Sequence, residues 1–228
     1  MKGEASNSWF TYVQQILHKY ELPNAHSIIA DPLSKKIWKN LIQQHIIGFW
    51  DESSRTQVAS MNSLRYLSMD SLALDHPALV WNNSSCSRLN TERALWKVKL
   101  MTGTYRLQTH ECLFNKGHAR LQPTCKLCET EAEDRLHFIT RCPALRFIRQ
   151  PYLGDLEDIL QTVDINLSSL SDELLLAIIL DVTNDIVPSP LRTCSVVIDR
   201  VESLSRNMLY HLHVTRWRIL QDHIEQQP

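Results

Sequence analysis

The feature that most constrains this chain is a group of three cysteines and one histidine between residues 125 and 142. It has the spacing C-x2-C-x8-H-x4-C and consists of Cys125, Cys128, His137 and Cys142. Two cysteines separated by two residues are typical of a tight knuckle turn that directs both thiolates into one site. One short helix and its C-terminal end can deliver His137 and Cys142. Three Cys and one His fill the four positions of tetrahedral zinc, so we predict a bound Zn²⁺ ion.

A coincidental arrangement is the alternative interpretation of the same spacing. The chain has 6 Cys, so two could fall two residues apart by chance, and unpaired cysteines are common in protein cores. The full four-ligand register favours zinc. The loop between the two ligand pairs is polar, as expected of a solvated knuckle; its polar residues are Glu129, Thr130, Glu131, Glu133 and Asp134.

The sequence predicts no catalytic centre and therefore no enzyme. A zinc site with four protein ligands has no open position for water and stabilises a fold. The chain lacks H-E-x-x-H, the P-loop motif and the G-x-S-x-G elbow, and no two Asp residues adjoin. With 5 Gly in 228 residues, a glycine-rich phosphate-binding loop is not expected either.

Two other groups of metal-ligating side chains are weaker candidates. His110, Cys112 and His118 have no fourth ligand at a suitable spacing, so we interpret them as structural. A second group could bind a hard metal, but a solvated helix face is the simpler interpretation; it comprises Asp155, Glu157 and Asp158.

The pattern of apolar residues predicts a mostly α-helical fold. Hydrophobic content is 43%, Gly is scarce, and apolar residues recur at helical spacing in several segments. We expect Ser8 to cap the first helix, Asp31-Pro32 to begin the second, and the Trp residues to anchor the core. Further helices are predicted over 91–101 (stopped by Gly103), 104–115, 133–140, from Pro143 onward, from Ser171 to about Asp185, and from Pro190 to about Gln221.

The predicted architecture is an irregular helical assembly with one Cys3His zinc knuckle and a long C-terminal helix. We divide it into a helical N-terminal region (1–85), a zinc-binding region (86–152) and a helical C-terminal region (153–228). The last helix carries an apolar stripe with a period near 3.5, which suits either self-association or packing inside the chain. The stripe comprises Leu191, Cys194, Ile198, Val201, Met208, Leu212 and Ile219.

Charge is unevenly distributed, although the whole chain has a net charge of only −1. Residues 86–150 hold 12 Lys and Arg against 6 Asp and Glu, whereas residues 151–189 hold 8 acidic residues and no basic ones. The basic segment could bind the phosphates of RNA or DNA, or the two segments could neutralise each other in the fold. The candidate phosphate contacts are Arg93, Lys97, Lys99, Lys126, Arg141, Arg146 and Arg149.

The sequence also bears on location. It has no N-terminal apolar segment typical of a signal peptide. It has no run of about 20 apolar residues that would predict a membrane span. Cysteines that serve as metal ligands favour a reducing compartment, so we expect a nuclear or cytoplasmic protein.

Three stretches carry a resemblance to a known family. They are R-A-L-W-K-V-K-L-M-T-G-T-Y-R-L-Q at Arg93–Gln108, P-T-C-K-L-C at Pro123–Cys128, and E-D-R-L-H-F-I-T-R-C-P-A-L at Glu133–Leu145. With them, residues 89–152 resemble the C-terminal zinc-binding segment that follows the reverse transcriptase domain in non-LTR (LINE-like) retrotransposon proteins. More weakly, Trp9–Trp50 and Met61–Tyr66 look like the helical segment before it.

The resemblance implies that Cys125, Cys128, His137 and Cys142 bind zinc. It also implies a role in binding the RNA template or the target DNA. The polymerase and endonuclease regions of such elements are missing from this sequence. We therefore expect a zinc-binding, nucleic-acid-binding module without its own catalytic centre. The alternative is a zinc-stabilised helical domain for protein–protein interaction, whose long C-terminal helix offers the working surface.

Overall fold

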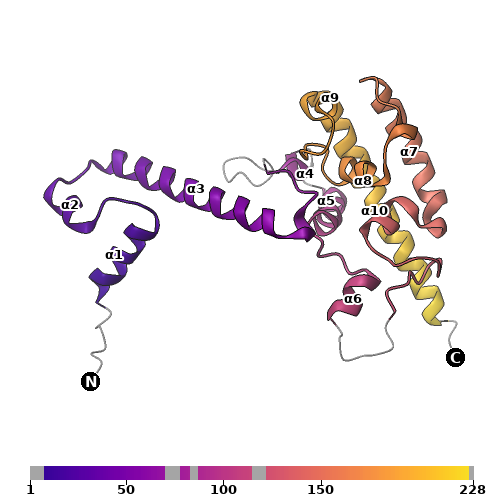
Figure 1. Ribbon diagram of the computed structural model, residues 1–228, viewed down its shortest axis with the longest axis horizontal. Coiled ribbons are helices and arrows are strands. Elements are labelled where there is room, and N and C mark those ends of the chain that lie inside the picture. Colours follow the sequence, from indigo (N-terminus) through magenta and orange to yellow (C-terminus); the bar gives the residue numbers. More distant parts are fainter. Residues whose placement is uncertain (1–7, 70–77, 83–86, 115–121, 226–228) are drawn as a thin grey trace. The chain divides into compact units, whose positions relative to one another are not determined.

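A computed structural model describes residues 8–69, 78–82, 87–114 and 122–225 (Figure 1). These residues form helices and connecting loops, so the predicted mostly α-helical fold is confirmed. The described residues form two compact units, one of residues 8–60, and one of residues 61–69, 78–82, 87–114 and 122–225. The regions predicted as zinc-binding and as helical C-terminal both lie in the second unit.

The first unit contains α1 (Trp9–Lys19), α2 (Ala25–Ala30) and α3 (Lys35–Ser60). Ser8 caps α1 as predicted, because its side chain accepts a hydrogen bond from the backbone N–H of Thr11.

The predicted helix start at Asp31-Pro32 is wrong. Asn24 caps the unexpected helix α2 by accepting from the N–H of Ser27, and Asp31 ends that helix. Helix α3 begins at Lys35, where the Ser34 hydroxyl accepts from the N–H of Ile37 at 3.4 Å.

Aromatic contacts hold the first unit together. Tyr20 meets Phe49 edge to face at a centroid distance of 5.1 Å, and the ring of His45 lies 3.0 Å from the carbonyl oxygen of Tyr20. The expectation that tryptophans anchor the core is wrong for Trp9, which is 77% exposed. Few side chains of this unit are buried; those described as buried are Leu17, Ala25 and Val58.

The second unit begins with the short helices around α5. Its elements there are η1 (Asn62–Leu64), α4 (Leu79–Asn82), α5 (Arg88–Met101) and α6 (Gln108–Phe114). Gly103 follows α5 with a φ of +70°, the left-handed conformation that the sequence predicted for a stop at this residue. A Cβ atom there would lie 3.0 Å from that of Ser63, so both conformation and space favour glycine.

The C-terminal half supplies most of the scaffold. It comprises η3 (His137–Arg141), η4 (Pro143–Leu145), α7 (Arg146–Gln161), η5 (Leu167–Ser169), α8 (Asp172–Leu180), α9 (Ser189–Thr193) and α10 (Ser195–Glu225). The predicted long C-terminal helix is present as α10, which packs against α5 and α7 (Figure 1).

Several predicted helix boundaries need correction. Helix α6 begins at Gln108 and not at residue 104, and the helix predicted over 133–140 is the π-helical turn η3. Helix α8 ends at Leu180 and not near Asp185, because Asp181 is extended and accepts a hydrogen bond from the N–H of Ser68 at 2.8 Å. The C-terminal helical segment is also not continuous. Cys194 adopts an extended conformation and separates α9 from α10.

The apolar stripe of α10 is buried within the second unit. Val201, Met208 and Leu212 are fully buried there together with side chains of α5, α7 and α8. The surface that would have served self-association through this stripe is therefore already covered by the chain itself. Phe147 on α7 is 64% exposed, while Leu145, two residues earlier, is fully buried. Among the described residues, no helix has the length and apolarity that a membrane crossing requires.

Candidate metal centre

A short backbone ladder builds the knuckle that carries Cys125 and Cys128. Thr124 and Ala132 form an antiparallel bridge, and the N–H of Cys125 donates to the carbonyl oxygen of Glu131 at 2.7 Å. The turn then closes through the N–H of Glu129, which donates to the carbonyl oxygen of Cys125 at 2.8 Å. Both cysteines are thereby fixed on one side of a tight loop.

A π-helical turn presents the other two ligands. In η3 the N–H of Cys142 donates to the carbonyl oxygen of His137 at 2.7 Å, a bond that spans five residues. Such a turn is wider than an α-helical turn and places residues five apart over one another, and π-turns often occur at functional sites. The x4 spacing between the last two ligands therefore fits this local geometry.

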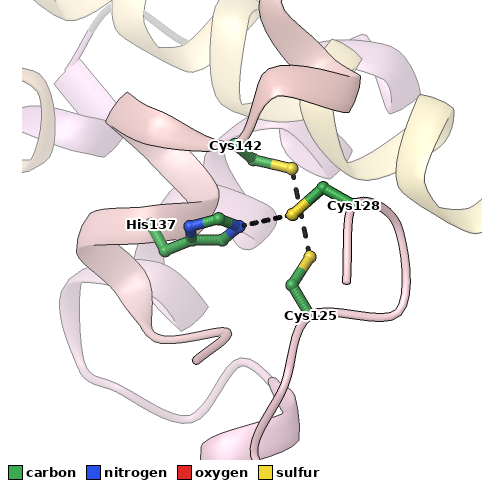
Figure 2. A group of neighbouring side chains, drawn as sticks. All are labelled: Cys125, Cys128, His137 and Cys142. Atoms are coloured by element: carbon green, nitrogen blue, oxygen red, sulfur yellow. Dashed lines mark hydrogen bonds between the residues drawn. The ribbon is translucent and has the colours of Figure 1, made fainter. Parts of the chain in front are cut away.

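The four side chains converge (Figure 2). Their ligand atoms all lie within 4.8 Å of one another, and all but Cys128 are buried. The Cys128 sulfur lies 3.3 Å from Nε2 of His137, and the Cys125 and Cys142 sulfurs are 3.9 Å apart. This arrangement could hold a metal ion, as the sequence predicted.

The distances fit a tetrahedral centre. With Zn–S bonds of about 2.3 Å and a Zn–N bond of about 2.0 Å, a tetrahedron has S–S edges of about 3.8 Å and S–N edges of about 3.5 Å. The observed separations of 3.9 Å and 3.3 Å are close to these edges.

The hydrogen bond between the two buried thiols shifts their pKa values in opposite directions. It is the main cause that lowers the pKa of Cys142, against the effect of burial, and that raises the pKa of Cys125, where burial adds to the rise. Backbone hydrogen bonds from Leu127 and Cys128 act on Cys125 in the opposite direction, and one from Ala144 lowers the pKa of Cys142 further. These backbone donors favour thiolate, the form that binds metal.

Glu131 orients the imidazole. Nδ1 of His137 lies 3.2 Å from the Glu131 carboxylate, which leaves Nε2 facing the cysteine sulfurs. Burial lowers the pKa of His137, but hydrogen bonds with Cys125 and Glu131 outweigh it and raise the pKa overall. A carboxylate on the outer nitrogen is the usual partner of a metal-bound histidine.

Glu133 connects the knuckle to two distant helices. It was expected in a solvated loop, but it is 1% exposed. Its carboxylate forms a two-pronged ion pair with Arg216 of α10, both contacts at 2.8 Å, and accepts the N–H of Gln108 at 2.9 Å. It also lies 4.0 Å from the Cys125 sulfur. Sequence reasoning missed this residue because its partner is 83 positions away.

Two of the seven candidate phosphate contacts are buried, so the structure does not support them as phosphate contacts. Lys97 is 1% exposed and donates to Glu202 at 2.6 Å and to Ser205 at 2.7 Å, both on α10. Arg149 is 5% exposed and donates to the carbonyl oxygen of Cys142 at 3.0 Å. Neither side chain is available to a ligand.

The other five candidates lie at or near the surface but not in one cluster. Lys126 and Arg146 are exposed, and Arg141 pairs with Asp172 at 2.7 Å. On α5, the Lys99 ammonium lies 4.0 Å from the ring centroid of Trp96. The Arg93 guanidinium lies 5.9 Å from the ring of Tyr210.

The weaker metal candidates do not assemble in the described residues. There, the only group of three or more suitable ligands is the Cys3His cluster. Nδ1 of His110 lies 2.9 Å from the carbonyl oxygen of Tyr105 instead, and His118 lies outside the described residues. Asp155, Glu157 and Asp158 are not brought together as ligands.

The chain matches no family model, no curated protein and no solved structure. The retrotransposon resemblance therefore remains a prediction from the sequence, and functional inference depends on the site itself.

Proposed function

We propose that this chain is a zinc-stabilised helical module in which the Cys3His cluster holds one Zn²⁺ ion as a structural element. The observation that carries the proposal is the convergence of four ligand atoms within 4.8 Å from two local motifs, the knuckle and the π-turn. Thiolate ligands with one imidazole favour zinc over the hard cations Mg²⁺ and Ca²⁺. Four protein ligands leave no position for a reacting water, so the ion acts on folding.

Metal analysis of the purified chain tests this proposal. We expect one zinc per chain in the wild type and loss of zinc in Cys142→Ser, since that change removes a buried ligand. Cys194→Ser is the matched control, because Cys194 is a half-buried cysteine outside the cluster, and it should keep its zinc. Wild-type protein that folds without metal would contradict the proposal.

The module's proposed ligand is single-stranded RNA or DNA. The supporting feature is a group of basic and aromatic side chains, partly buried except for the exposed Trp217. This group, the α5–α10 strip, comprises Arg93, Trp96, Lys99, Tyr210, His213 and Trp217. Trp96 stacks on His213 at a centroid distance of 3.5 Å, and Trp217, one turn further along α10, is 57% exposed. Cationic groups beside aromatic faces suit phosphates and unpaired bases. The retrotransposon resemblance supports the same class of ligand.

Binding of labelled single-stranded RNA and DNA over a range of salt concentrations tests this part. Affinity should fall as salt rises, because phosphate neutralisation releases counterions. Lys99→Ala should reduce the slope of log K against log salt by about one. Arg192→Ala is the control, since Arg192 lies on α9 and pairs with Asp185. No binding at low salt, or binding without salt dependence, would count against it.

The alternative of a protein-interaction domain built on the C-terminal helix is less well supported. Its surface was the apolar stripe of α10, but Val201 is buried and Ile198 packs against the core. Charged substitutions at these positions would unfold the second unit rather than disrupt a dimer.

A further inference from the structure

Arg149 is a buried cation without a carboxylate. The described residues with strongly buried positive side chains are Lys97, Arg149, Arg206 and Arg216. Lys97 and Arg206 pair with Glu202, and Arg216 pairs with Glu133. Within the described part of the chain, no carboxylate lies within 4.0 Å of the Arg149 guanidinium.

Its hydrogen bonding is also incomplete. One terminal nitrogen donates to the carbonyl oxygen of Cys142 at 3.0 Å, whereas Nε is buried and has no partner among the described atoms. Asp172, the acid whose charge acts on Arg149, already pairs with Arg141 at 2.7 Å. A buried charge without a partner is strongly destabilising, so a nearby anion is expected.

The proposed zinc centre supplies such an anion. Three thiolates, one neutral imidazole and Zn²⁺ together carry a net charge of −1. The charge of Glu133, the buried acid beside the cluster, is already matched by Arg216. The net negative charge of the metal–thiolate centre is therefore balanced by Arg149, which donates a hydrogen bond to the carbonyl oxygen of the ligand Cys142.

We propose that Arg149 is the counter-ion of the anionic Cys3His metal centre, and that its charge favours metal binding by three thiolates over binding by two. The inference rests on the zinc centre proposed above. A positive charge beside Cys142 stabilises the net negative charge of the metal–thiolate centre, and so strengthens metal binding. Arg149 acts on the ligands and does not itself bind the metal.

A double-mutant cycle on the full chain tests this role, with Co²⁺ as the spectroscopic probe and Zn²⁺ in competition for affinity. Arg149→Met should weaken metal binding about 10- to 100-fold with the natural ligands, the range seen for residues that support metal ligands. Cys128→His converts the centre to two thiolates and two imidazoles, whose zinc complex is neutral. In that background Arg149→Met should weaken metal binding by no more than about threefold. Cys128 suits this change because it is the least buried ligand.

Two further variants separate charge from packing. Arg149→Lys keeps the charge and should restore most of the affinity. Arg146→Met removes an exposed arginine of the same helix and should leave affinity unchanged. If Arg149→Met folds only in the Cys128→His background, the charge role is supported as well.

Equal losses in both backgrounds, or failure to fold in both, would show that Arg149 is a packing residue and would overturn the proposal. Failure of wild-type protein to bind Co²⁺ or Zn²⁺ would instead contradict the zinc centre itself.

Discussion

The two compact units of this chain differ in what stabilises them. In the first, helix α3 extends over 26 residues, yet Val58 is its only described buried side chain, and Tyr20 contacts Phe49 edge to face. The second unit has an extensive apolar core, buried ion pairs and the Cys3His cluster. The helices of the first unit therefore depend on local contacts and capping, whereas the second depends on links between distant residues.

Metal removal should produce the largest difference in stability between the two units. Binding of structural zinc contributes about 10 to 16 kcal/mol to folding in zinc-finger peptides, so Cys142→Ser or a strong chelator should abolish the protection of α8 and α10. Hydrogen exchange followed segment by segment measures this. Helices α1 to α3 should exchange at the same rate with and without metal. Unchanged protection of α8 and α10 in the chelator would contradict the distinction.

Breaking the buried ion pair should have the next largest effect. Arg216→Met leaves the Glu133 carboxylate buried and unpaired, which should cost about 3 to 5 kcal/mol of unfolding free energy. Arg141→Met, which breaks an exposed pair with Asp172, is the control and should change stability far less. Denaturant unfolding monitors both, and equal effects would mean that the contact through Glu133 does not tie the knuckle to α10.

Truncating apolar side chains should distinguish the units by packing. Leu160 is fully buried on α7, so Leu160→Ala should cost about 2 to 5 kcal/mol. Ile37 on α3 is mostly exposed, so Ile37→Ala should stay within about 0.5 kcal/mol. Unfolding by denaturant checks both changes. A large cost at Ile37 would show that the first unit has a packed partner surface after all.

The smallest predicted effect is a loss of folding stability at acidic pH. Burial lowers the pKa of His213 from 6.5 to about 4, and the charges of Arg216 and Lys99 add to the shift. As the pH falls, His213 therefore takes up a proton near pH 6.5 in the unfolded chain but only near pH 4 in the folded chain. Stability should fall as pH drops through this window, and His213→Gln should lose that part of the slope. Parallel pH profiles would contradict the assignment. Metal release through His137 affects both proteins and cancels in the comparison.

The convergence of the four Cys and His side chains and the helical fold could be predicted because their signals are local. The spacing from Cys125 to Cys142 falls within one knuckle and one turn, and the stop at Gly103 follows from the conformation that it adopts. Capping by Ser8 is another short-range effect.

The surroundings of the site could not be predicted because they depend on distant partners. Lys97 is a charged residue that a helical pattern places on the surface, yet it is buried by Glu202 and Ser205, more than 100 positions later. Glu133 is buried by Arg216 in the same way. A single sequence carries no sign of these pairings, since each residue alone is ordinary surface charge.

X-ray absorption at the zinc edge on purified protein tests the central claim most directly. The account predicts one zinc per chain with three sulfur neighbours at about 2.3 Å and one nitrogen at about 2.0 Å. A shell made of oxygen and nitrogen alone, or folded protein without zinc, would contradict it.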